Sequence, residues 1–178
     1  VILPAVSLKY EMQRDMFIRA GYNSSIARPT LREISTFVNF DYFGDYTVAG
    51  NYRLASNPTT LHNFDFRWEV YPSNKEVVAV GAFFKYLDKP IELASIPESP
   101  NTAFQFQNLP FAYLFGVELE LKQGLGILGE WGENFVMGAN LGIIYSQARI
   151  RNNELAVMRI DNPSVSKFRP LFGQSPYV

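Results

Sequence analysis

Charged side chains recur at every second position in two segments of the chain, and they are the first candidates for chemistry. The set comprises Asp65, Arg67, Glu69, Glu118, Glu120 and Lys122. Two carboxylates on one face could serve a glycosidase as acid and nucleophile. The same residues could instead lie on a wall that faces a water-filled lumen, where they would form cross-strand ion pairs. We favour the wall, because the interior of a membrane β-barrel is polar throughout.

Three other features could bind a ligand, and each has a simpler interpretation. His62 is the single histidine and cysteine is absent, so we interpret His62 as an ordinary strand residue and exclude a histidine-rich metal site. Glycine-rich residues 124–133 lack the Lys-Ser/Thr pair and the helix of a phosphate loop, which favours a hairpin connection. Polar residues 28–33 could contact substrate, but local ion pairing that fixes a loop explains them as well. These patterns therefore predict no catalytic, cofactor-binding or metal-binding residue.

Strands must position the charged residues. Over residues 63–70, polar side chains alternate with large apolar ones, which predicts a strand with one apolar and one polar face. Similar alternation predicts strands over residues 6–10, 16–22, 78–86, 113–121 and 135–145. We also expect a weak strand signal over 37–48, loops over 50–60 and 88–101, and one helical turn over 29–33. No helix longer than this turn is predicted.

The alternation also predicts which side chains share a face. The apolar set, expected to face lipid in a membrane barrel, is Phe64, Phe66, Trp68, Val117, Leu119, Met137, Leu141 and Ile143. The polar set, expected to face the lumen, is Asp65, Arg67, Glu118, Glu120 and Asn140.

Composition narrows the possible classes of protein. The 178 residues suit one domain or a piece of a larger one, and the formal charge of −1 gives no electrostatic argument for nucleic acid. No apolar run is long enough for a transmembrane helix, and the N-terminus lacks the features of a signal peptide. The pattern alone leaves open a membrane barrel, a soluble β-sandwich binding module or adhesin, and an enzyme on a β scaffold.

An ordered series of short motifs favours the barrel. The motifs occupy residues 3–5, 18–23, 27–33, 50–51, 63–72, 83–86, 89–92, 113–118 and 169–177. In this order they resemble the C-terminal barrel region of TonB-dependent outer-membrane receptors, of the Bacteroidetes type. The resemblance covers nearly the whole chain, and each motif is weak alone. Tyr52 stands where the family usually has proline, and Phe172 replaces a common glutamine.

The resemblance implies the fold and the extent of the chain. The fold is all-β, an antiparallel up-and-down meander that forms part of a large transmembrane barrel of about 22 strands. Residues 1–178 would be a partial barrel domain, with the plug domain, the TonB-binding segment and the remaining strands not present. Such a piece should not transport anything by itself.

The resemblance also implies function and partners. The family binds a small nutrient at the outer membrane and takes it up with energy delivered through TonB, without catalysis or cofactor. Its partners would be the lipid bilayer, the plug, the remaining strands, TonB and a possible surface lipoprotein, and nucleic acid is not expected. The candidate substrate-facing loops are residues 30–60 and 88–108, because barrel loops are long on the outside. The substrate and the residues that bind it stay unassigned.

Overall fold

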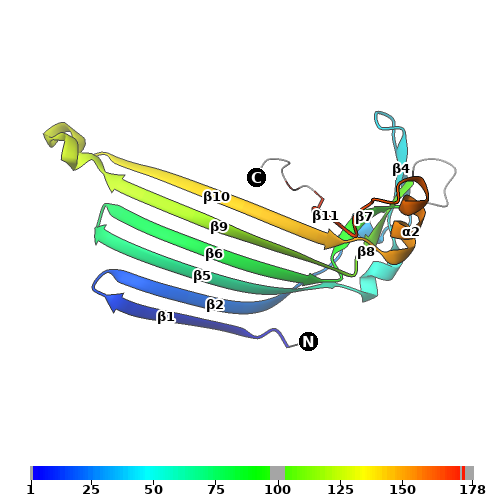
Figure 1. The fold of residues 1–178 in the computed structure, drawn as a ribbon, viewed down its shortest axis with the longest axis horizontal. Coiled ribbons are helices and arrows are strands. Elements are labelled where there is room, and N and C mark those ends of the chain that lie inside the picture. The colour runs from blue at the N-terminus through cyan, green and yellow to red at the C-terminus, as the bar shows by residue number, and fades with distance from the viewer. Residues whose placement is uncertain (1, 97–102, 173, 175–178) are drawn as a thin grey trace.

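Six long strands form one curved antiparallel sheet in the computed structural model, which describes residues 2–96, 103–172 and 174 (Figure 1). They are β1 (Ala5–Gln13), β2 (Met16–Ala27), β5 (Thr59–Ser73), β6 (Glu76–Asp88), β9 (Phe111–Gly124) and β10 (Val136–Arg149). A short strand, β11 (Phe168–Arg169), pairs with the end of β10 and completes the order β1-β2-β5-β6-β9-β10-β11. The predicted meander is confirmed, with strands longer than the alternation alone indicated.

The register sorts side chains into rows that cross the sheet. Trp68 pairs with Ile18 and Val80, and that row continues through Leu119 to Leu141. Directly paired residues point to the same face of a sheet, and neighbours along a strand point to opposite faces. The two face sets predicted from alternation are therefore confirmed: the apolar side chains share one face and the charged side chains share the other.

Short connections join the long strands at one end of the sheet. Asp15 adopts a positive φ of 62° in the turn between β1 and β2, and a tight turn at residues 74–75 joins β5 to β6. The connection from β9 to β10 contains the 3-10 helices η2 (Leu125–Leu128) and η3 (Glu130–Gly132). Gly129 between them has a φ of 103°, which only glycine adopts readily. The predicted hairpin connection is confirmed here.

The opposite end of the sheet carries a second, four-stranded sheet (Figure 1). Its strands are β3 (Val38–Asp41), β4 (Tyr46–Ala49), β7 (Ile91–Ser95) and β8 (Ala103–Asn108), in the order β3-β4-β8-β7. The loop predicted over residues 88–101 was therefore wrong in part, because β7 occupies 91–95. Residues 97–101 of that loop lie outside the described residues.

Helical segments accompany this second sheet. They are α1 (Leu31–Ile34), η1 (Tyr52–Ser56) and α2 (Asn152–Asp161). The predicted helical turn is confirmed as α1, whose N-cap is Thr30. We expected no helix longer than this turn, and that expectation was wrong, because α2 spans 10 residues. Only half of its residues are strong helix formers, and its apolar residues do not recur with a helical period.

Little of the long sheet is covered by other parts of the structure. The small buried cluster of Leu109, Ala112 and Ala148, with Leu87 and Leu171 against it, lies near the second sheet. Large apolar side chains along the wall stay exposed, including Leu141 at 62%. A soluble sandwich would cover that face with another sheet. No helix among the described residues has the length and apolar character to cross a membrane.

Candidate functional site

Four charged side chains form a network on the polar face of the sheet. Glu69 accepts from Arg19 Nε through Oε1 at 2.5 Å and from Arg67 Nε through Oε2 at 2.9 Å. Arg67 also donates from Nη2 to Glu120 Oε2 at 2.6 Å. The network therefore crosses the sheet from β2 through β5 to β9.

This geometry supports the wall interpretation over the glycosidase one. A general acid must hold its proton near neutral pH, which requires a carboxyl without a cationic partner. Glu69 and Glu120 are both ion-paired with Arg67. No ion pair involves Asp65 or Glu118 in the described part of the chain, but both project from the same open face. These side chains therefore form a polar, water-exposed wall, and they do not form the acid–nucleophile pair of a glycosidase.

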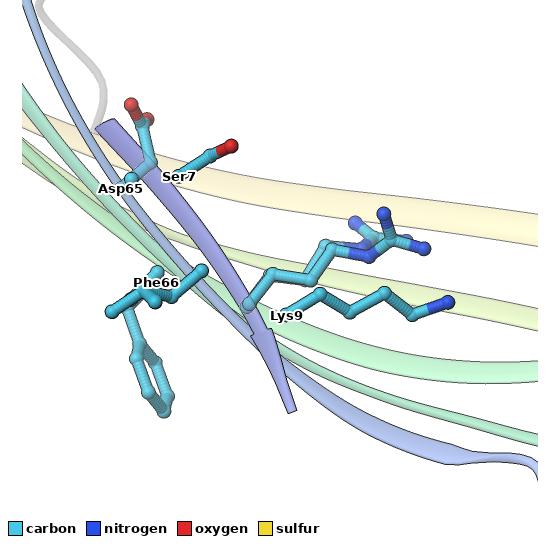
Figure 2. A pocket seen from close by; sticks show the side chains of 9 residues that line it. Ser7, Lys9, Asp65 and Phe66 are labelled. Carbon is cyan, nitrogen blue, oxygen red and sulfur yellow. The ribbon is translucent and has the colours of Figure 1, made fainter. Parts of the chain in front are cut away.

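The polar face is hollowed beside this network. The hollow is lined by residues of β1, β2 and β5: Ser7, Leu8, Lys9, Arg19, Ala20, Gly21, Asp65, Phe66 and Arg67. Figure 2 shows Ser7 and Asp65 on one side of the sheet and Phe66 on the opposite side. No group of three potential metal-binding side chains occurs within residues 2–96, 103–172 and 174.

His62 belongs to an aromatic band on the apolar face. Its Nδ1 lies 2.9 Å from the hydroxyl of Tyr22, and its ring lies 6.3 Å from that of Tyr86. The band occupies the end of the wall next to the second sheet, and its members are Tyr22, His62, Phe64, Phe84, Tyr86, Tyr113, Phe115 and Tyr145. His62 is thus an ordinary wall residue. Sequence reasoning missed the band because it is assembled across five strands.

The first candidate substrate-facing loop, residues 30–60, contains a projecting aromatic hairpin. Tyr42 and Phe43 at its tip are 85% and 106% exposed, where a core would bury them. Asp41 holds the tip by accepting hydrogen bonds from the backbone N–H groups of Phe43 and Gly44, both at 2.9 Å. The bond from Gly44 is the main cause of the lowered pKa of Asp41. The tip is therefore a fixed turn that presents two aromatic rings to solvent.

A capped helical turn supports the base of the hairpin. Thr30 N–H donates to Glu33 Oε2 at 2.6 Å, and Glu33 N–H donates to Thr30 Oγ1 at 3.4 Å, which is a capping box. Gly50 lies against this turn so closely that a Cβ would meet the carbonyl oxygen of Ser35 at 2.0 Å. Asn51 N–H donates to Glu33 O at 2.6 Å.

The second candidate loop, residues 88–108, is anchored by buried carboxylates. Glu92 of β7 is 8% exposed, and its Oε2 lies 2.7 Å from Arg169 Nη2. Its Oε1 accepts from Phe172 N–H at 3.1 Å. Glu154 of α2 is 7% exposed, and burial raises its pKa against the opposing effect of Arg169. These contacts connect β7 to α2 and to the segment that follows β11.

The two candidate loops meet in one sheet. Thr47, Val48 and Ala49 of the first pair in parallel with residues 103–105 of the second. Gln105 Nε2 donates to Gly50 O at 3.2 Å, across the same junction. The structure thus brings the two loops together at one end of the wall.

A family model for the TonB dependent receptor-like beta-barrel matches residues 1–169. The chain belongs to this family. Its long sheet is therefore a section of an outer-membrane barrel wall, with the apolar face toward lipid and the charged face toward the lumen. The predicted fold class and outer-membrane location are confirmed, and the alternative of a soluble sandwich was wrong. The Bacteroidetes type stays a prediction.

Solved receptor barrels share the fold of this wall. The ferric enterobactin receptor PfeA, in complex with BCV-L6, superposes with a TM-score of 0.61 at 14% identity, covering 83% of this chain and 25% of that one. The siderophore receptor PirA from Pseudomonas aeruginosa gives 0.59 at 15% identity, covering 84% and 31%. The chain thus spans about a quarter to a third of these receptors. No curated protein sequence matches it significantly.

Proposed function

We propose that the chain is part of an outer-membrane receptor that binds a nutrient outside the cell and imports it with energy supplied through TonB. The observation that carries the proposal is the four-stranded sheet in which the two candidate loops meet. This sheet lies at the end of the wall where the connections between the long strands are long. Long barrel loops lie on the outer side, so this sheet is the extracellular end. Its exposed aromatic hairpin is the part of the described chain best placed to meet a substrate first.

The remaining parts of the receptor follow from the family. A plug domain and further strands would complete residues 1–178 to a closed barrel of about 22 strands. TonB would act on a segment outside this sequence, and a surface lipoprotein is a further candidate partner. The receptor would make and break no bond in its substrate and would need no cofactor.

Substrate binding can be tested at the hairpin tip of the full-length receptor. Tyr42→Ser combined with Phe43→Ser removes both exposed rings while leaving the Asp41 turn bonds in place. Trp131→Ser removes an exposed ring at the opposite end of the wall and is the matched control. The substrate panel should include ferric siderophores, cobalamin, oligosaccharides and peptides, with binding to whole cells measured separately from uptake.

The expected result is a substrate whose uptake requires TonB and whose binding weakens in the tip variant but not in the control. A substrate that enters equally well without TonB would contradict the transport proposal. Unchanged binding in the tip variant would remove the hairpin as the capture element while leaving transport in place.

A further inference from the structure

Arg149 lies on the lipid-facing side of the wall, at its extracellular rim. Along β10 it follows Tyr145 and Gln147 on the same face, and it pairs with Phe168 of β11. Its guanidinium carbon lies 5.8 Å from the centroid of the Phe111 ring. No carboxylate forms an ion pair with Arg149 among the residues that the structure describes. A cation is therefore held over an aromatic ring with its charge uncompensated.

The rings beneath Arg149 form a continuous shelf. Phe111 stacks on Tyr86 at 6.0 Å and lies 6.1 Å from Phe168, which in turn lies 6.5 Å from Tyr113. Aromatic residues of membrane barrels gather at the level of the lipid headgroups. Arg149 is level with Phe168 and Phe111 and one step further along the strands from the membrane centre than Tyr86 and Tyr113, which places it at the headgroup level.

We propose that Arg149 and the Phe111–Phe168 shelf bind the phosphate of an anionic lipid in the outer leaflet. A guanidinium can donate two parallel hydrogen bonds to a phosphate, and the ring beneath it fixes the plane of that fork. The rings would contact the apolar part of the same lipid. This site goes beyond nutrient uptake, and it rests on the proposed assignment of this rim as the extracellular end.

Two charged neighbours modify the site in opposite directions. Lys167 is exposed next to Phe168, and its carbonyl accepts from Ile150 N–H at 2.9 Å, so the backbone of this second basic residue is bonded to the residue after Arg149. Asp88 pairs with Phe111 from the β6 side and places a negative charge two strands from Arg149. Removing Lys167 should weaken phosphate binding, and neutralising Asp88 should strengthen it.

The test uses the full-length receptor in an uncharged detergent, with bound lipid counted by native mass spectrometry. The probes are bisphosphorylated lipid A, its dephosphorylated form and inorganic phosphate. Arg149→Gln is expected to weaken binding of the phosphorylated lipid about fivefold, as for one basic residue at an anionic surface. Arg14→Gln, at the opposite rim, is the matched control, because Arg14 is an exposed arginine outside the shelf.

Lys167→Gln removes a positive charge at an exposed position and should not affect folding. Asp88→Asn removes a negative charge, so its effect on phosphate binding should be the opposite. The proposal predicts weaker binding for Lys167→Gln, tighter binding for Asp88→Asn and no change for Arg14→Gln. Equal binding of the phosphorylated and dephosphorylated lipids would overturn it. So would binding of inorganic phosphate as tight as that of the lipid, or wild-type lipid binding in both the Arg149 and the Lys167 variants.

Discussion

Arg19 and Arg67 are direct cross-strand partners on the lumen face, although like charges in this position repel. Glu69 resolves the conflict because each of its carboxylate oxygens accepts from one of the two arginines. Its side chain is only 3% exposed, whereas both arginines reach water. The stability of this part of the wall therefore depends on one carboxylate.

Glu69→Gln in the full-length receptor should destabilise the barrel by about 1–3 kcal/mol, because charge-assisted hydrogen bonds are lost and two arginines remain opposed. Urea unfolding in lipid vesicles measures the change. Glu118→Gln is the control, since Glu118 has no ion pair among the described residues. Adding Arg19→Gln should recover part of the loss. A double variant as unstable as the sum of the two single changes would show that the opposed arginines are not the cause.

Leu141→Arg should impair assembly by about 2–4 kcal/mol, the cost of a cation on the lipid face near the membrane centre. Asn140→Arg is matched to it, one residue away on the lumen face and paired with Glu120. Heat-modifiable migration on gels and membrane-protected labelling report assembly. Equal effects of the two arginines would reverse the assignment of the faces.

Asp41→Ala should loosen the hairpin tip, because two backbone N–H groups lose their acceptor. Asp41→Asn should keep most of the order, since its amide oxygen can still accept. The lowered pKa of Asp41 means that its stabilising effect is present above the unfolded pKa and is lost as pH falls through the folded value. Amide hydrogen exchange at residues 42–46 follows all three effects. Exchange that is unchanged in Asp41→Ala would show that other contacts hold the tip.

Glu154 should give α2 the opposite pH dependence. Burial raises its pKa, so the folded state binds the proton more tightly than the unfolded state, and the stability of the docked helix falls as pH rises through the folded pKa. Hydrogen exchange of α2, corrected for intrinsic rates, should show greater protection in acid than at neutral pH. Glu154→Gln should flatten this dependence. A wild-type helix with pH-independent protection would contradict the assignment.

Gly50→Ala should separate α1 from the start of η1, because the new Cβ would meet Ser35 O at 2.0 Å. We expect a local loss of about 1–3 kcal/mol, as for other overpacked sites. Gly21→Ala is the control, since its Cβ would meet its nearest neighbour, Asp65 Cβ, at 3.9 Å. Limited proteolysis between residues 28 and 58 measures the difference. Equal resistance of the two variants to proteolysis would show that α1 moves without cost.

The long wall could be predicted from sequence because the alternation of residues along one strand shows which side chains share a face. Phe66 and Arg67 of β5 are neighbours with opposite character, and the contrast recurs in β9, where Leu119 follows Glu118. The second sheet was less visible, since β7 is short and follows Pro90 directly. The helix α2 was missed because its buried residues are the adjacent pair Glu154 and Leu155, which is not a helical repeat. The ion-pair network and aromatic band depend on register, which no single strand records.

The parallel pairing of β4 with β8 also limits how the outer surface can diversify. Segments separated by more than fifty residues share backbone hydrogen bonds there, so neither can be shortened or exchanged without exposing the edge of the other. Transplanting a new specificity onto this wall would require both segments to be moved as a single cassette. Changes in side chains at the hairpin tip avoid that constraint, which makes the tip the more freely evolvable part of the mouth.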